Sequence, residues 1–463
     1  MSGLSMKKTV ALASLLGAAF LGSGSQAQTP AAQPDLTPRI AGAYQRILAI
    51  SQRADHVTDY NDLRNLQQIY GFYVDKALWD EVLDLFAEDG TLELGQNGVF
   101  VGKPAIRKYL YSLTDGKPGL MKGQLNNHFT LSPVITIAPD AKSAKARWRA
   151  LIQDGIYGAG SGGNWGSGVY ENEYVKQDGV WKIRTLHLFV KFYAPYEGGW
   201  TKAADDSALR YARSKVKPSK PPSVAYKPWP ARFTPPFHYE NPVQSKYLYA
   251  PAGPPAANGP APKTVTDLEA QVRALELRLD RLKAGDDVEN LESTYGYYAD
   301  KSMQDAMSAL FAENSTLEIL GRGVFIGSDR VYEYMRRLGA PTRGNLYNHM
   351  QLQPVVHVAA DGQSAHVRAR LFVMFGGLER GAQWGEGVYE NYFIRENGVW
   401  KYQNLNGFQT FYTDYEKGWA KHSSAMFSPF PGYPPDQPQS VDYGPYPAPF
   451  VPPFHYKNPV SGK

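Results

Sequence analysis

The stretch Tyr70–Asp80 reads YGFYVDKALWD, and Tyr295–Asp305 reads YGYYADKSMQD. The sequence LFAEDGTLEL that follows the first stretch, at Leu85–Leu94, returns in the same register as LFAENSTLEI at Leu310–Ile319. Self-similarity of this length indicates two copies of one structural unit. The fold of the chain therefore depends on what a single copy can form.

The similarity continues to the end of each copy. The matched pairs are GVFVG at Gly98 with GVFIG at Gly323, NHFTLSPV at Asn127 with NHMQLQPV at Asn348, WGSGVYEN at Trp165 with WGEGVYEN at Trp384, and PPFHYENPV at Pro235 with PPFHYKNPV at Pro452. A chain of 463 residues also exceeds what one core usually supports. We predict a first domain at 36–217, a Pro-rich tail and linker at 218–262, a second domain at 263–426 and a Pro-rich tail at 427–463. Each tail is expected to lie over its own domain.

Changes of hydrophobic period give the elements within a copy. Amphipathic helices are predicted over Leu36–Arg53 and Thr266–Gly285, and a further helix over Asp62–Phe86, ended by a turn at AEDG. A hairpin over Thr91–Val101 and a short helix from Gly102 follow. Long strands are predicted over His128–Ala138, Lys142–Tyr157, Val169–Lys176 and Trp181–Tyr193. Helices followed by a meandering antiparallel sheet indicate an α+β fold, in which the bent sheet wraps round the helices and leaves a pocket.

Bulk composition narrows the class of protein. The chain is 43% hydrophobic, carries a net charge of +5 and has no cysteine. Because Lys and Arg are dispersed, no nucleic-acid partner is expected, and the absence of cysteine excludes disulfides and thiolate sites. Lys7, Lys8 and the apolar stretch Val10–Leu21, before Ser25-Gln26-Ala27, are typical of a signal peptide over 1–27. We therefore expect a periplasmic protein with no membrane span after cleavage.

The motifs together resemble a known family. The run D-x-x-x-W-D-x-V-x-x-L-F-A-E-D-G-T-L-E, then N-H-x-x-x-x-P-V and Y-E-N-x-Y-x-x-x-x-G-V-W-K-I, is similar to the SnoaL-like branch of the nuclear transport factor 2-like superfamily. The resemblance implies two tandem cone-shaped α+β barrels, also called cystatin-like. The tyrosine-rich frame Y-G-x-Y-x-D-K also looks like lyases that release formaldehyde from lignin-derived diarylpropane and phenylcoumaran compounds.

Similarity to scytalone dehydratase implies candidate catalytic residues. There an aspartate on the first helix, just ahead of a D-W-D-like turn, pairs with a histidine that opens the first long strand. Those motifs fall on Asp75 with His128, and on Asp300 with His349. A carboxylate on an imidazole fixes its tautomer and raises its basicity, so the pair can act as a general base. The alternatives are a core histidine, and a surface ion pair between the aspartate and the next lysine.

Further candidates lie near this pair. Tyr73 and Tyr298 are potential phenolic donors or aromatic core residues. Arg149 and Arg370 lie in apolar strands, where a charge needs a partner, and Glu171 and Glu390 on the next strand are the expected partners.

The two copies differ at one further candidate. His187 in the first copy aligns with Asn406 in the second, so the first copy is the expected active one if only one works. We expect the two copies to pair as a pseudo-dimer, and the sequence leaves further self-association open.

No motif indicates a cofactor or a metal. The sequence therefore predicts a cofactor-independent lyase that acts on a small aromatic or hydrophobic molecule by Asp-His chemistry. A dehydratase or isomerase of the same fold, and a periplasmic protein that binds a hydrophobic ligand without turnover, remain open.

Overall fold

A computed structural model describes residues 37–158, 163–202, 216–244, 261–340, 342–424 and 427–463. The predicted signal peptide, 1–27, lies outside the described residues, and so do residues 245–260 of the predicted linker. Within the described part, none of the helices is both long and apolar enough to span a membrane.

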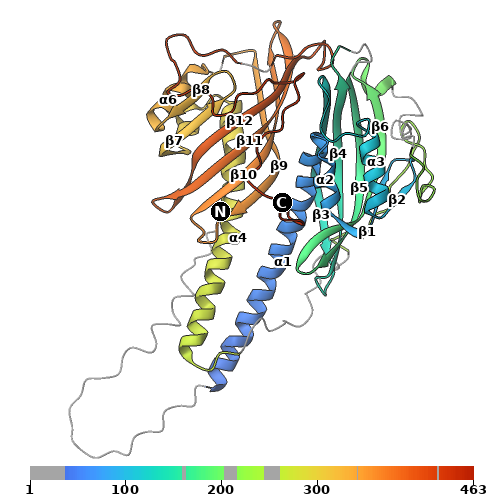
Figure 1. Cartoon of the computed structure of the whole chain (residues 1–463). Helices are drawn as coiled ribbons and strands as arrows, with labels where there is room; N and C mark the ends of the chain where they lie inside the picture. Colours follow the sequence, from blue (N-terminus) through green and yellow to red (C-terminus); the bar gives the residue numbers. More distant parts are fainter. Residues whose placement is uncertain (1–36, 159–162, 203–215, 245–260, 341, 425–426) are drawn as a thin grey trace, which may run out of the picture.

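The first copy is a bent six-stranded sheet wrapped round helices (Figure 1). Its elements are α1 (Thr37–Asp75), α2 (Trp79–Asp84), β1 (Phe86–Leu94), β2 (Val99–Val101), α3 (Lys103–Ser112), β3 (Gln124–Ile137), β4 (Ser143–Ile156), β5 (Gly163–Gln177) and β6 (Val180–Pro195). The strand order is β2-β1-β6-β5-β4-β3, and β3 to β6 form the predicted antiparallel meander. The pair of β1 with β6 is parallel, and the chain between them includes β2, α3 and the first three strands of the meander.

The second copy repeats this architecture. Its elements are α4 (Val265–Asp300), α5 (Gln304–Ser308), β7 (Phe311–Ile319), β8 (Gly323–Ile326), α6 (Ser328–Arg337), β9 (Asn345–Val358), β10 (Ser364–Gly377), β11 (Gly381–Glu396) and β12 (Val399–Asp414). The strand order, β8-β7-β12-β11-β10-β9, matches that of the first copy. The prediction of two tandem α+β cones is therefore confirmed.

The long helix of each copy ends at the aspartate of the repeated motif. Two residues later, Ala77 (φ 51°) and Ser302 (φ 49°) have the left-handed backbone conformation, which an α-helix cannot include. The single helix predicted over Asp62–Phe86 is therefore wrong in its second half. Phe86 already begins β1, so the AEDG segment lies in a strand and not in a turn.

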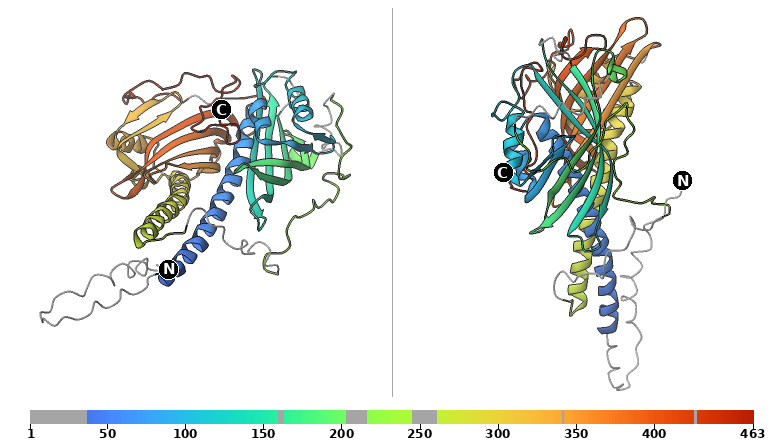
Figure 2. Two further views of the ribbon diagram at one scale, coloured as in Figure 1. Left: turned by 60° about the horizontal axis from the view of Figure 1, so that its bottom comes forward. Right: turned by 90° about the vertical axis from the view of Figure 1, so that its right-hand side faces the viewer.

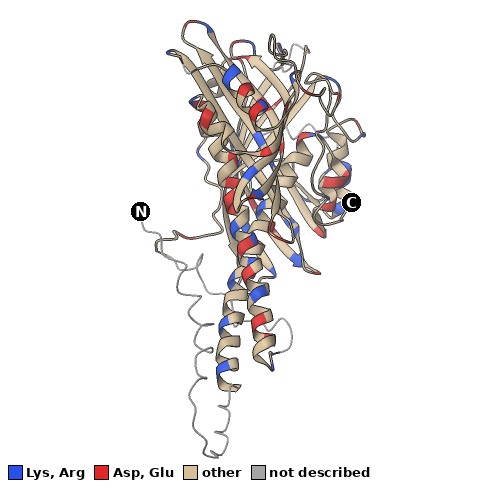
Figure 3. Ribbon diagram, turned by 90° about the vertical axis from the view of Figure 1, so that its left-hand side faces the viewer, with Lys and Arg blue, Asp and Glu red and all other residues tan. Residues whose placement is uncertain are grey.

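The N-terminal parts of α1 and α4 project together from the cones as a pair of long helices (Figures 1 and 2). The helix predicted over Leu36–Arg53 and the one predicted from Asp62 form the single 39-residue α1. Acidic and basic side chains alternate along both helices (Figure 3). Arg64 with Glu289, and Arg278 with Asp55, form ion pairs between the two helices.

The two cones share a buried interface. Leu125 of the first copy packs in one apolar cluster with Phe411, Trp419 and Tyr446 of the second. The Trp419 indole N–H donates to the carbonyl of Asp154 at 2.9 Å. The cones therefore pack as a pseudo-dimer within one chain.

The C-terminal tail joins the cones a second time. Phe454, Tyr456 and Val460 pack against the core of the first cone, and the Asn458 side chain donates to the carbonyl of Glu81 at 2.9 Å. The second tail is therefore laid over both domains.

Candidate active site

Asp75 does not contact the imidazole of His128. Its carboxylate accepts a hydrogen bond from the backbone N–H of His128 at 2.6 Å, and Asp300 contacts the backbone N–H of His349 in the same way. The expected carboxylate–imidazole pair is therefore wrong in both copies. In each copy the aspartate binds the backbone of an edge strand, β3 or β9, at its histidine.

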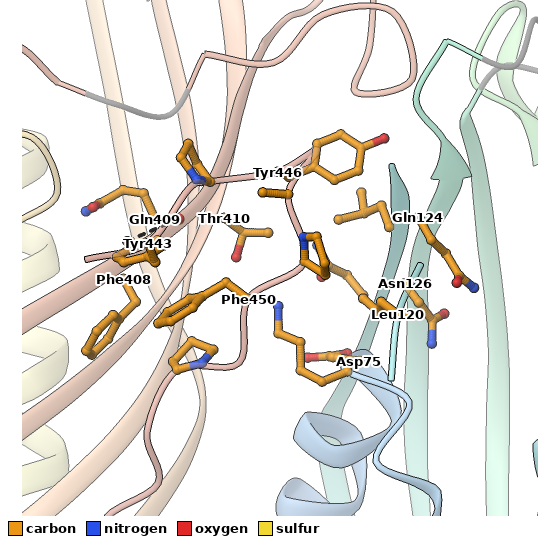
Figure 4. Close-up of a pocket in the computed structure, with 17 residues that line it drawn as sticks. Asp75, Leu120, Gln124, Asn126, Phe408, Gln409, Thr410, Tyr443, Tyr446 and Phe450 are labelled. Carbon is orange, nitrogen blue, oxygen red and sulfur yellow. Dashed lines mark hydrogen bonds between the residues drawn. The ribbon is translucent and has the colours of Figure 1, made fainter. Parts of the chain in front are cut away.

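Asp75 lines the space between the cones (Figure 4). Its neighbours there include Asn126 of β3, Gln409 of β12 and Phe450 of the tail. The cavity measures 20 Å³, which is enough for about one water molecule. Asp75 is thus 1% exposed and faces no volume that an aromatic substrate can enter.

Arg370 connects Asp75 to the second cone. It forms a buried ion pair with Asp75, and another with Glu386 of β11 at 2.8 Å. Burial raises the pKa of Asp75 to about 6, although Arg370 acts in the opposite direction. Burial disfavours the Arg370 cation, but the two carboxylates outweigh that effect and raise its pKa. Asp75, Arg370 and Glu386 therefore form a buried ion-pair network that connects the two copies.

The expected partners of the strand arginines are wrong. Glu171 pairs with Arg147 and Glu390 pairs with Arg368, each directly opposite in the sheet register. Arg149, which matches Arg370 in the repeat, is exposed. Neither strand arginine contacts the interior of a cone, because both point to the outer face of the sheet, where Arg370 meets the other copy.

His187 lies on the face of β6 that is covered by the first tail. Its neighbours in the strand, Leu186 and Leu188, point into the core, so the alternation of side chains turns His187 the other way. Its ring stacks on Phe189 at 3.8 Å, and its Nε2 lies 3.6 Å from Glu93. Burial lowers its pKa to about 4. The structure does not bring His187 together with His128.

The two strand histidines do point into the cones, and each meets a tyrosine of the repeated WG-x-GVYEN motif. His128 Nε2 forms a hydrogen bond with the Tyr170 hydroxyl, and His349 Nε2 lies 3.2 Å from the Tyr389 hydroxyl. Burial lowers the pKa of His128 to about 3 and that of His349 to about 4. Both imidazoles are therefore neutral at neutral pH and can accept a hydrogen bond from the phenol.

A cavity of 290 Å³ lies in the second cone, between its helices and its sheet. Aromatic side chains dominate its wall, and His349 and Tyr389 lie in it. It is lined by Tyr295, Ala299, Ser302, Gln304, Met307, Ile319, Arg322, Tyr334, Arg337, Leu338, Tyr347, His349, Leu371, Phe375, Tyr389, Gln409, Tyr412, Phe427 and Phe430. Phe427 and Phe430 come from the C-terminal tail, so the tail forms part of the wall.

Two buried positions of the first cone hold tryptophan where the second copy has a smaller side chain. Trp148 stands where the second copy has Ala369, and Trp79 stands where it has Gln304. Trp148 is 1% exposed and donates to the Tyr174 hydroxyl at 3.2 Å, while Trp79 donates to Thr114 at 2.8 Å. Of the two positions, only that of Trp79 corresponds to a residue of the cavity wall, Gln304. The aromatic cavity beside His349 favours the second copy as the reactive one, in contrast to the expectation from His187.

The tyrosines that line the cavity differ from those expected. Tyr73 packs edge-on against Phe454 of the tail, and Tyr298 is a partly buried residue at the edge of the second core. The cavity phenols are Tyr295, Tyr334, Tyr347, Tyr389 and Tyr412. Burial raises the pKa of Tyr295, Tyr389 and Tyr412, which therefore remain protonated donors. Tyr389 is not among the candidates predicted from the sequence, although it lies in a motif that both copies share, where its counterpart is Tyr170.

Within the described residues, no group of three or more His, Asp or Glu side chains is placed to hold a metal ion. The cavity wall contains no carboxylate, so it offers only His349 and neutral oxygens as ligands.

Comparisons with known proteins give the following likenesses. A scytalone dehydratase-like protein of Novosphingobium aromaticivorans is 20% identical, with 32% of this chain and 95% of that chain covered and a TM-score of 0.28. A hexachlorocyclohexane dehydrochlorinase of Novosphingobium barchaimii is 20% identical, with 29% and 92% covered and a TM-score of 0.27. No curated protein matches the chain.

The SnoaL-like domain model matches the chain twice, over residues 55–187 and 280–406. The two matches together cover more than half of the 463 residues, and each includes the strand histidine of its cone. The chain therefore belongs to the SnoaL-like domain family and carries two copies of the domain in tandem.

Proposed function

We propose that the protein is a cofactor-independent lyase that converts a small aromatic molecule in the second cone. The observation that carries this proposal is the 290 Å³ aromatic cavity in which the His349 and Tyr389 side chains meet. A cavity of about this volume is at the lower end of the range for small-molecule sites. It suits a ligand with one or two aromatic rings.

Tyr389 and His349 form a path for one proton. In the tautomer whose Nε2 carries no proton, the phenol donates to Nε2, and the phenol oxygen can accept the proton of a substrate hydroxyl as its own proton moves to Nε2. Tyr295 and Tyr412 remain protonated and can donate a hydrogen bond to a leaving oxygen. Asp300 supports this path only by holding the backbone of His349.

The sharper form of the proposal is release of formaldehyde from a lignin-derived diarylpropane or phenylcoumaran diol. The proton of the terminal hydroxymethyl group passes to His349 through Tyr389, and the C–O bond becomes the carbonyl of formaldehyde. The electrons of the broken carbon–carbon bond form a double bond as the benzylic oxygen leaves and takes a proton. The products are formaldehyde and a stilbene, with one water where the benzylic oxygen is a free hydroxyl.

The test is incubation of the purified protein with such diols, followed by product mass and a formaldehyde assay. His349→Ala and Tyr389→Phe should abolish release, whereas His128→Ala and Tyr170→Phe, the same changes in the first cone, should leave it intact. Thermal unfolding of each variant checks that it is folded. Unchanged release by both second-cone variants would refute the site. Loss of water alone would indicate a dehydratase, and an unchanged mass with a shifted double bond would indicate an isomerase.

A second candidate is ligand binding without turnover. It is favoured by the low pKa of His349, because a base with a pKa near 4 is a weak proton acceptor at neutral pH. Ligand-dependent thermal stabilisation with recovery of unchanged ligand would support it.

A further inference from the structure

The cavity of the second cone carries an unbalanced positive charge. Arg322 and Arg337 line it, no Asp or Glu lines it, and its histidine is neutral because burial lowers the His349 pKa to about 4. The other lining groups are apolar, aromatic or uncharged. A site of this kind attracts an anion with an apolar body.

Arg322 is held in place without an acidic partner. It lies in the turn between β7 and β8, where its guanidinium donates to the Tyr334 hydroxyl at 2.8 Å. It stacks over Phe430 at 4.1 Å and over Phe427 at 4.7 Å. Among the described residues, no carboxylate forms an ion pair with it, and its buried Nε has no hydrogen-bond partner. The planar donor fork of arginine matches a carboxylate in two hydrogen bonds.

The first cone shows that packing does not require this charge. Its equivalent of Arg322 is Asn97, which donates to Tyr109, the equivalent of Tyr334, at 2.9 Å. A neutral amide therefore holds the equivalent tyrosine in the first cone. Because Arg322 lines the cavity of the second cone and its positive charge is not needed to hold the tyrosine, the charge is available to the contents of that cavity.

Arg337 adds a second cation at the edge of the same cavity. It is exposed, stands at the end of α6 and lies 4.3 Å over the ring of Tyr433. The first cone has Ser112 at this position. Because an exposed charge is screened by salt, we expect Arg337 to aid capture of the ligand and Arg322 to hold it.

We propose that the second cone binds its aromatic ligand as a carboxylate anion, with the carboxylate on Arg322 and the approach favoured by Arg337. The ring then lies among the cavity aromatics, and the rest of the molecule extends toward Tyr389 and His349. The inference takes the second cone as the ligand site from the proposed function, but binding can be measured without turnover.

The experiment is calorimetric titration of the purified protein with trans-cinnamate and with cinnamyl alcohol, its neutral counterpart. We expect cinnamate to bind at least about tenfold more tightly than the alcohol. Arg322→Asn introduces the first-cone residue and keeps a donor for Tyr334. It should lower the affinity for cinnamate about tenfold and leave the affinity for the alcohol unchanged. Arg337→Ser should lower the affinity for cinnamate less than Arg322→Asn does, and mainly at low salt.

Arg330→Asn is the matched control, because Arg330 pairs with Asp436 and does not line the cavity. It should change neither affinity. Equal affinities of the two probes, equal weakening of both by Arg322→Asn, or no binding of either at about 1 mM would overturn the inference. The formaldehyde assay is read separately. Selective cinnamate binding without release by the native protein would keep this inference and reject the lyase.

Discussion

At the scale of single residues, one buried charge of the second cone has a neutral counterpart in the first. Glu292 of α4 accepts hydrogen bonds from Asn391 at 2.8 Å and from Tyr402 at 3.0 Å. The first cone has Gln67 at this position, which accepts from Asn172 at 2.9 Å. Burial raises the pKa of Glu292 from 4.5 to about 7. The first copy thus carries a neutral side chain of the same shape.

Glu292→Gln is expected to stabilise the protein at alkaline pH. The raised pKa means that Glu292 favours folding most below its unfolded pKa of 4.5, and that this contribution is lost as pH rises through about 7. The loss is on the order of 3 kcal/mol. Unfolding by denaturant at several pH values should show the advantage of the variant widening from about pH 5 to about pH 8. Parallel curves for the two proteins would contradict the prediction.

The pH dependence of turnover tests the environment of His349. Activity requires the neutral ring, and burial lowers its pKa to about 4. The rate should therefore stay level down to about pH 5 and fall only as the pH approaches 4, whereas a solvent-exposed histidine would titrate near 6.5. A fall centred near 6.5 in initial-rate measurements would show that the ring is not desolvated as described.

Residue types in the motif were predictable, but their contacts were not. The repeated motifs predict that Asp75 lies beside His128, and the structure places them together. The motifs do not predict whether the carboxylate binds the backbone N–H or the imidazole, because that depends on where α1 ends. The partner of Arg370 lies in the other copy, so no strand pattern within one copy indicates it.

At the scale of elements, α4 packs closely on β9. A Cβ at Gly296 would collide with the His349 carbonyl oxygen and the Gln351 side chain, so only glycine allows this approach. Because His349 lies at this contact, the packing of the helix sets the position of the proposed base.

Gly296→Ala is expected to lower both stability and turnover. The collision with backbone should destabilise the fold by about 1–3 kcal/mol and displace His349. Gly42→Ala, in α1 with nothing within 4 Å of its Cβ, is the control and should be neutral or slightly stabilising. Thermal unfolding and initial rates measure the two effects. Full activity in Gly296→Ala would show that the helix does not set the base.

The helices and strands were largely predictable, because the repeat gives two different sequences with the same hydrophobic period for each of them. The cavity of the second cone was not predictable. Trp79 and Trp148 are visible in the sequence beside Gln304 and Ala369, but whether a large side chain fills a cone or lines it depends on the curvature of the folded sheet.

At the scale of the whole molecule, the two cones are joined by a buried charge. Arg370→Met should destabilise the protein by about 3–5 kcal/mol, because it leaves the buried carboxylates of Asp75 and Glu386 without their ion-pair partner. Arg149→Met, at the matching exposed position, should change stability by less than about 0.5 kcal/mol. Chemical denaturation compares the two. Equal changes in the free energy of unfolding would mean that the ion pairs of Arg370 between the cones do not contribute to stability.

The tail that crosses between the cones also sets the order in which the chain can fold. Asn458 meets Glu81 across 377 residues of sequence, and Phe454, Tyr456 and Val460 complete the core of the first cone. Domains usually fold in the order of their synthesis. Here the first cone lacks part of its core until the ribosome has made the second cone and its tail. The copy that is translated first therefore completes its folding only after the whole chain has been made.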